Sequence, residues 1–202
     1  VLIIFLENDY YQGISFKIMF IHVPAAWLSL MIFFSMGISS VIGLIFKSPT
    51  SFTISRSLSP VGLIMSIIVL ITGSVWGNLT WGTYWVWDAR LTSMLILAFI
   101  YLGHLFLLYS FEHFQKADFA ASILAIIGMV NIPIVKFSVD WWTTLHQGSS
   151  VFKISGPSMT TDYFITLMVS FFAILLLSLY WFTNIFYIIT EKRRIERAKL
   201  LN

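Results

Sequence analysis

The stretch YFITLMVSFFAILLLSLYWFTNIFYIIT, from Tyr163 to Thr190, is 28 residues long and contains no charged side chain. Because a helix of about 20 apolar residues crosses the hydrocarbon core of a bilayer, this stretch predicts a transmembrane helix. The basic cluster that follows it is typical of a juxtamembrane tail and consists of Lys192, Arg193, Arg194, Arg197 and Lys199. This end of the chain therefore indicates a membrane protein.

The composition of the whole chain supports this prediction. Of the 202 residues, 58% are hydrophobic and only 10% are charged, with a mean hydropathy of +0.89. Soluble domains carry about 25% charged residues, so an ordinary soluble domain is excluded. Hydropathy predicts spans at about 18–46, 58–77, 91–110, 119–137 and 163–190, and we interpret the apolar stub before residue 7 as the end of a sixth span whose beginning is missing. The predicted fold is an all-α polytopic membrane protein, a six-span helical bundle forming a single integral membrane domain over residues 1–202.

Basic residues predict the orientation of this bundle. Strict alternation places loops 7–17, 78–90 and 138–162 on one side, and loops 47–57, 111–118 and the tail 191–202 on the other. The second side carries eight basic residues, and the first carries Lys17, Arg90, Lys136 and Lys153. By the positive-inside rule the second side faces the cytoplasm or the mitochondrial matrix, although the tail alone could produce this bias.

The outer loops contain most of the tryptophans. One string is WGTYWVWDARLT (81–92), in a tryptophan-rich loop at about 78–92, and the other is SVDWWTTLHQG (138–148), in a histidine loop at about 138–162. An interfacial aromatic belt is the ordinary explanation, and it would suffice for Trp76, Trp81 and Trp181 taken singly. Belts scatter along a sequence, whereas these tryptophans cluster, which favours a binding surface. The clustered residues are Trp81, Trp85, Trp87, Trp141 and Trp142.

Two charged residues follow the first tryptophan cluster. Asp88 is expected to cap a helix that begins near Ala89. Arg90 would lie in the first turn of that helix, where a cation opposes the helix dipole, so it is expected to meet an anion. That anion could be Asp88, a lipid headgroup or the carboxylates of a ligand.

The four histidines and the absence of cysteine limit which metals or cofactors the chain can bind. With no cysteine, the chain has no disulfide, no thiolate metal site, no iron–sulfur cluster and no C-x-x-C-H haem attachment sequence. Of four histidines, only His22 and His146 share a side with the tryptophan-rich loop. Each could simply bond a carbonyl group, and Pro24 could either kink the helix that carries His22 or mark its start.

Two imidazoles, an aromatic platform and an arginine suit haem better than other common ligands. Histidine ligates haem iron, aromatic rings cover the macrocycle, and arginine pairs with propionate. Zinc would need a third or fourth protein ligand, and the outer side offers only four carboxylates for that role, so zinc ranks below haem. Those carboxylates are Glu7, Asp9, Asp140 and Asp162.

Three strings also resemble a known family. WGTYWVWDARLTS (81–93) resembles the tryptophan-rich WWD signature of haem-handling proteins, and IHVPAAW (21–27) with NIPIVKFSVDWWTTLHQG (131–148) resembles the cytochrome c maturation protein C family. The likeness covers nearly the whole chain, and Tyr84 departs from it, standing where many members carry tryptophan. The resemblance implies haem b with His22 and His146 as axial ligands. It also implies a haem-binding platform of Trp81, Trp85, Trp87, Asp88, Arg90, Trp141 and Trp142.

The resemblance further implies a function. It predicts a haem-binding and haem-transfer protein, not an enzyme, in the bacterial cytoplasmic membrane or the mitochondrial inner membrane. Such a protein presents haem on the outer face and passes it to a membrane-anchored haem chaperone. The implied partners are that chaperone, a small single-span accessory subunit, the ABC-type ATPase and membrane subunits of the same pathway, and the lipid bilayer, with no nucleic acid.

The main alternative is a transporter or channel subunit whose aromatic loop forms an outer vestibule. Its expected sign is ionisable residues deep in the spans, and only His104 qualifies. An intramembrane hydrolase is disfavoured, because no serine or aspartate stands at a suitable spacing from a partner base.

Overall fold

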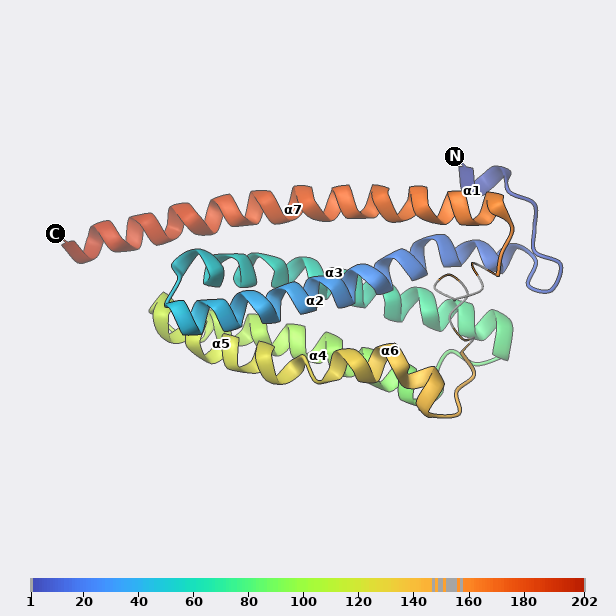
Figure 1. Cartoon of the computed structure of the whole chain (residues 1–202), viewed down its shortest axis with the longest axis horizontal. Helices are drawn as coiled ribbons and strands as arrows, with labels where there is room; N and C mark the ends of the chain where they lie inside the picture. The colour runs from blue at the N-terminus through green and yellow to red at the C-terminus, as the bar shows by residue number, and fades with distance from the viewer. Residues whose placement is uncertain (1, 147, 149–150, 152–155, 157, 202) are drawn as a thin grey trace.

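A computed structural model describes residues 2–146, 148, 151, 156 and 158–201. The described residues are helical apart from their connections (Figure 1), which confirms the predicted all-α class. Within the described part of the chain, five helical stretches are long and apolar enough to cross a membrane. The stub that was expected to end a sixth span forms only a four-residue helix. The helices are α1 (Leu2–Phe5), the 3-10 helix η1 (Ile14–Ile18), α2 (Met19–Phe46), α3 (Pro49–Trp81), α4 (Ala89–Tyr109), α5 (Phe114–Gly128), α6 (Asn131–Trp141) and α7 (Thr161–Leu201).

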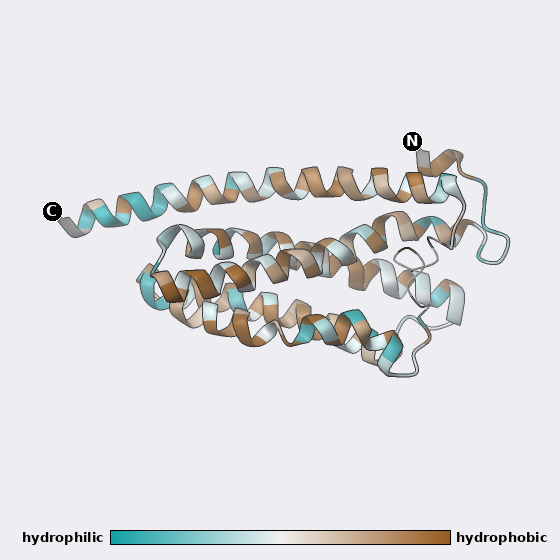
Figure 2. Cartoon of the chain, viewed as in Figure 1, coloured by the Kyte–Doolittle hydropathy of each residue, from teal (hydrophilic) through white to brown (hydrophobic). Residues whose placement is uncertain are grey.

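The spans run in alternating directions, so their connections gather at two ends of the bundle (Figure 1). We call the end that holds the α3–α4 and α6–α7 connections the outer end, and the end that holds the α2–α3 and α4–α5 connections the inner end. Helix α7 packs along α2 and α3, and its hydrophilic last turns extend beyond the inner end (Figure 2). Lys153, one of the basic residues counted for the outer side, lies outside the described residues.

Helix α3 is longer than predicted, because it includes the polar residues 49–57 that we expected to form a loop. Ser48 caps the helix by accepting a hydrogen bond from the backbone N–H of Ser51 at 3.3 Å, and Pro49 occupies the first position. The Thr53 hydroxyl donates to the carbonyl of Pro49 at 2.8 Å, and Arg56 is buried. Hydropathy missed this turn because its polar side chains bond within the protein and avoid lipid.

The span predicted at 119–137 is two helices with a break. Helix α5 ends at Gly128 and α6 begins at Asn131. Pro133 explains the break, since its ring cannot donate a hydrogen bond to the carbonyl of Met129 and would clash with it. The Asn131 amide donates to the carbonyl of Ser93 at 2.9 Å, which fastens the start of α6 to α4.

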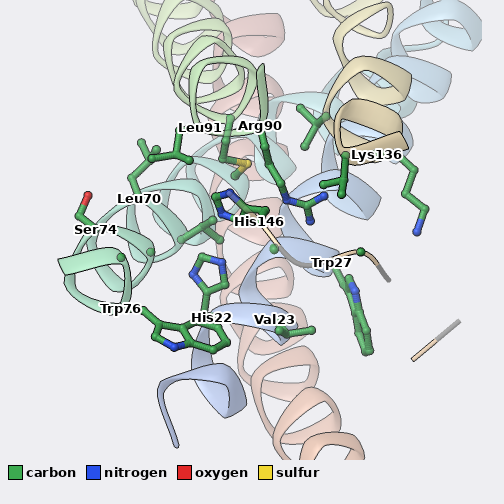
Figure 3. A pocket seen from close by; sticks show the side chains of 18 of the residues that line it. His22, Val23, Trp27, Leu70, Ser74, Trp76, Arg90, Leu91, Lys136 and His146 are labelled. Carbon is green, nitrogen blue, oxygen red and sulfur yellow. The ribbon is translucent and has the colours of Figure 1, made fainter. Parts of the chain in front are cut away.

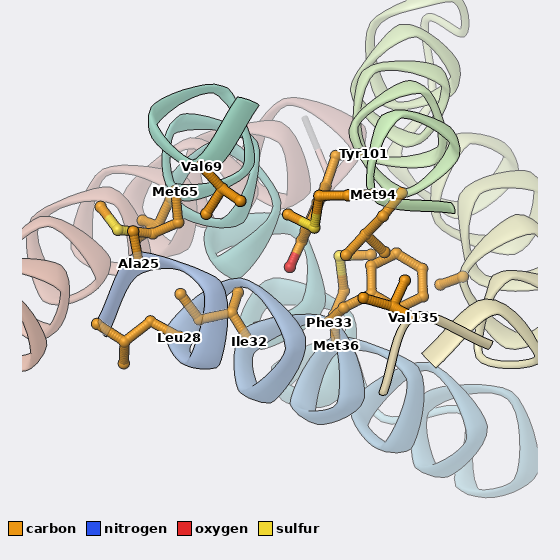
Figure 4. Packing of buried hydrophobic residues seen from close by; sticks show 13 residues of the cluster. Ala25, Leu28, Ile32, Phe33, Met36, Met65, Val69, Met94, Tyr101 and Val135 are labelled. Atoms are coloured by element: carbon orange, nitrogen blue, oxygen red, sulfur yellow. The ribbon is translucent and has the colours of Figure 1, made fainter. Parts of the chain in front are cut away.

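The core lies mainly between α2, α3 and α4, with Ala125 of α5 and Val135 of α6 at its side, and its buried hydrophobic side chains pack together (Figure 4). Tyr101 is fully buried, packs edge-to-face on Phe33 at 5.0 Å between ring centroids, and donates its hydroxyl to the carbonyl of Ser29 at 2.7 Å. Gly62 lies directly against the Tyr101 ring. Small residues at such crossings let membrane helices approach closely.

We predict that Gly62→Ala lowers the free energy of unfolding by about 1–3 kcal/mol, because the added methyl group would overlap the buried Tyr101 ring. Gly103→Ala is the matched control, since its methyl group would meet only the tip of the Leu124 side chain, at 3.2 Å. Thermal unfolding in detergent measures both variants. Equal stability of the two variants would contradict the prediction.

Candidate functional site

A cavity of about 460 Å³ lies at the outer end of the bundle, within the size range of small-molecule sites (Figure 3). Helices α2, α3, α4 and α6 and the chain that follows α6 contribute its walls. Five of the residues predicted from the sequence line it together: His22, Trp81, Trp85, Arg90 and His146.

Local capping places two of these residues. Helix α3 ends at Trp81 because Gly82 adopts a left-handed backbone with φ of 75°, which glycine tolerates, and its N–H bonds the carbonyl of Asn78 at 3.1 Å. Asp88 then caps α4 as predicted, accepting from the backbone N–H of Leu91 at 2.8 Å. The tryptophan-rich loop is therefore reduced to residues 82–88, and Arg90 lies in the first turn of α4, where it reaches the cavity.

His22 lies in the second turn of α2, two residues before Pro24. Helix α2 begins at Met19, so Pro24 lies within the helix and does not mark its start. The Nδ1 atom of His22 is 2.9 Å from the Thr72 hydroxyl, and that hydroxyl donates to the carbonyl of Ile68 at 2.6 Å. Because the Thr72 proton is used in this way, Thr72 accepts a hydrogen bond from His22, whose Nε2 is then free of a proton.

His146 comes from the loop after α6. Its ring packs edge-to-face on Trp81 at 5.0 Å between centroids, and its Nδ1 atom lies 3.5 Å from the carboxylate of Asp88. Burial, and after it the Arg90 cation, lowers the pKa of His146 below the ordinary value of 6.5, while Asp88 opposes this shift. The ring is therefore neutral near pH 7, as a metal ligand must be.

The two imidazoles face one cavity. Figure 3 shows the rings of His22 and His146 directed toward each other, with the Arg90 side chain beside His146. The Trp85 indole N–H is buried and has no hydrogen-bond partner among the described residues, so a donor is available at the wall.

These donors suit haem better than a zinc ion. No group of three His, Asp or Glu side chains with metal-binding geometry occurs among the described residues. Two histidines, indole walls and a guanidinium fit a flat apolar macrocycle that carries carboxylates and needs two axial ligands.

Four residues that we predicted for the platform do not line the cavity. Trp87, Trp141 and Trp142 are 77%, 56% and 49% exposed. Trp141 ends α6 and stacks on Phe137, with 5.4 Å between ring centroids. Asp88 lies behind His146, in contact with its ring.

The cavity also contains residues that sequence reasoning missed. Trp76 lines it, packs edge-to-face on His22 at 5.8 Å between centroids, and donates its indole N–H to the Gln12 side chain at 3.0 Å. We had assigned Trp76 to an aromatic belt. Trp76 lies four residues after Thr72 and therefore on the same face of α3, but no pattern in the sequence marked either residue as a neighbour of His22.

His104 does not belong to this site. It is buried in the bundle, where its Nδ1 atom lies 3.0 Å from the Ser59 hydroxyl and its Nε2 atom 3.5 Å from the Ser55 hydroxyl. Both ring nitrogens therefore have protein neighbours. His104 is therefore a core histidine that is bonded within the bundle. It was the main residue that favoured a transport pathway, so the transporter alternative loses that support.

Comparison with known proteins agrees with the strings noted in the sequence. The family model described as Heme exporter protein C matches residues 1–200. Heme exporter protein C of Bradyrhizobium diazoefficiens is 45% identical over 84% of this chain and 65% of its own length. The Escherichia coli K12 protein of the same name is also 45% identical, over 86% of this chain and 70% of its own. A cytochrome c biosynthesis ccmC-like mitochondrial protein of Marchantia polymorpha is 45% identical over 92% of this chain and 76% of its own length.

The chain thus spans about two thirds of the length of the Bradyrhizobium relative. Five apolar spans and these relatives identify a multi-pass inner-membrane protein. Since the family model covers nearly every residue, including both histidine segments and the tryptophan-rich loop that form the outer cavity, the chain belongs to the heme exporter protein C family.

Proposed function

We propose that this protein binds haem at the outer end of the bundle and transfers it during cytochrome c biogenesis, as a delivery component and not an enzyme. The observation that supports this most strongly is that His22 and His146, which are far apart in the sequence, line one cavity with tryptophan side chains. The names of the relatives, heme exporter protein C and ccmC-like protein, agree with haem handling.

Five of the lining residues have a role in this proposal. His22 and His146 would hold the iron of haem b as its axial ligands, Trp81 and Trp85 would cover the macrocycle, and Arg90 would pair with a propionate. Trp87, Trp141 and Trp142 are exposed and do not line the cavity, and in this proposal they would contact the haem edge or the acceptor protein.

Orientation follows from the basic tail in this proposal. The last turns of α7 carry the basic cluster 192–199 beyond the inner end, which therefore faces the cytoplasm or matrix. The cavity then opens on the outer face, where a membrane-anchored haem chaperone takes the haem. Membership of an exporter family supports association with the ABC-type ATPase and membrane subunits. A small single-span subunit is a further partner in this proposal.

An absorption spectrum of the purified protein, with and without reductant, tests the function. We expect the sharp reduced bands of a low-spin, six-coordinate haem. A spectrum without haem bands after haem supplementation would contradict the proposal and favour an aromatic vestibule of a transporter.

Arg90→Ala should weaken haem binding by roughly 10- to 100-fold, because a charge-assisted hydrogen bond contributes about 1.5–3 kcal/mol. The low-spin spectrum should remain, since both histidines are retained, and Arg90→Lys should lose less. Arg194→Ala, which removes an exposed cation at the inner end, is the control. Haem titration followed by absorbance measures the affinities, and an Arg90→Ala affinity equal to that of the control would contradict this role.

A further inference from the structure

The two histidines of the cavity are held by different kinds of acceptor. His22 Nδ1 bonds the neutral hydroxyl of Thr72 at 2.9 Å, whereas His146 Nδ1 faces the Asp88 carboxylate at 3.5 Å. Both acceptors are fixed by helix backbone. Thr72 donates to the carbonyl of Ile68 one turn earlier in α3, and the other carboxylate oxygen of Asp88 accepts the Leu91 N–H at the start of α4.

Buried atoms support the pairing of His146 with Asp88. The Nδ1 atom of His146 and the Oδ2 atom of Asp88 are both buried and lie 3.5 Å apart, and neither forms a hydrogen bond with any of the described residues. A buried donor or acceptor without a partner costs about 1–3 kcal/mol, so a small movement that shortens their separation is favoured.

An acceptor on Nδ1 sets the properties of the opposite nitrogen. It keeps the proton on Nδ1, leaves the Nε2 lone pair for a metal and fixes the direction of the ring. A carboxylate draws the Nδ1 proton toward itself and makes the imidazole more basic. A neutral hydroxyl is a weaker acceptor than a carboxylate, so the two rings differ as ligands.

We propose that Thr72 and Asp88 are positioning residues that present the Nε2 atoms of His22 and His146 to haem iron, with His146 the stronger ligand and His22 the one that releases first. This inference rests on the proposed function. On this inference His22, on α2, would release its ligand first, and His146, in the loop after α6, would hold it longer.

Substitutions that keep shape and remove one acceptor test the proposal. Thr72→Val removes the hydroxyl, and Asp88→Asn removes the charge but keeps an oxygen for the Leu91 cap. Thr72→Ser restores the hydroxyl and should behave as the unaltered protein. Thr53→Val is the matched control at the inner end, because Thr53 makes the same bond to a carbonyl four residues earlier.

The readouts are the spin state and the reduction potential of the haem-loaded protein. Asp88→Asn should reduce the preference for ferric over ferrous haem by about tenfold, which raises the potential by about 59 mV for one electron. Thr72→Val should leave the potential closer to that of the unaltered protein. It should instead increase the five-coordinate, high-spin fraction and speed haem release to apomyoglobin about tenfold, with added imidazole restoring the low-spin spectrum.

The outcomes separate this inference from the proposed function. If the unaltered protein shows low-spin haem but Thr72→Val and Asp88→Asn match Thr53→Val in both readouts, the positioning roles are wrong and the haem site stands. A larger potential change in Thr72→Val than in Asp88→Asn would overturn the order of ligand strength. If the unaltered protein binds no haem, the proposed function itself fails. Circular dichroism of each variant confirms that its helix content is unchanged before the spectra are compared.

Discussion

Replacing Asp118 with alanine is expected to lower the free energy of unfolding by about 3–5 kcal/mol, because it breaks a buried ion pair. Asp118 lies at the inner end and is 3% exposed. Its carboxylate forms ion pairs with two guanidinium groups, those of Arg56 and Arg193, and no other carboxylate among the described residues does so. Removing it leaves buried positive charge without compensation. Breaking a buried ion pair from one side costs far more than losing a surface pair.

The hydrogen bonds of the Asp118 carboxylate explain why its loss should be so destabilising. One Asp118 oxygen accepts from Arg56 Nη2 at 3.0 Å and Nε at 3.2 Å, and the other accepts from Arg193 Nη2 at 2.6 Å. Both guanidinium groups lie 4.5 Å from the centroid of the Phe114 ring. The cluster therefore joins α3, α5 and α7, and α7 otherwise packs on only one side of the bundle.

Thermal unfolding in detergent tests this prediction, with Glu191→Ala as the control. Glu191 contacts Arg194 at 4.0 Å on the surface of the same helix, and exposed pairs contribute at most about 1 kcal/mol. Asp118→Ala should lower the melting temperature on the order of 10 °C, whereas Glu191→Ala should change it little. Equal melting temperatures for the two variants would show that the ion pairs of Asp118 are solvated and do not stabilise the fold.

Hydropathy predicted the helical class and the five spans because lipid contact imposes a strong compositional signal. It failed at the inner end for a physical reason. Arg56 was counted in a loop, yet it lies in α3 and its charge is met by Asp118, which single-sequence hydropathy cannot show. The ion pair between Arg56 and Asp118 lets the polar start of α3 remain helical. Such a pair joins residues far apart in the sequence, so it depends on how the helices pack.

The outer site shows the same division between local pattern and packing. His22, His146, Arg90, Trp81 and Trp85 were predicted to share a site, and the structure brings them to one cavity. Composition could identify a tryptophan cluster but not which rings turn inward. Which rings turn inward depends on where the flanking helices end. The sequence predicted that this span ends at residue 77, four residues before α3 ends at Trp81.

The largest functional effect is expected from the two histidines. His22→Ala and His146→Ala should each abolish the six-coordinate low-spin spectrum, because a lost imidazole leaves the iron with one protein ligand. His113→Ala is the matched control, since His113 is an exposed histidine at the inner end, where it lies 3.9 Å from Glu196. Absorption spectra at equal protein and haem concentrations measure the effect.

Added imidazole distinguishes a lost ligand from a collapsed cavity. A variant that keeps its fold has a space the size of the missing ring beside the iron, so free imidazole should restore the low-spin bands, whereas a misfolded variant should not respond. Restoration in His22→Ala and His146→Ala, with unaltered bands in His113→Ala, would mean that each ring acts through the metal. Native bands in either alanine variant without added imidazole would exclude that histidine as an axial ligand, and the cavity would then need a different ligand or a different pair of residues.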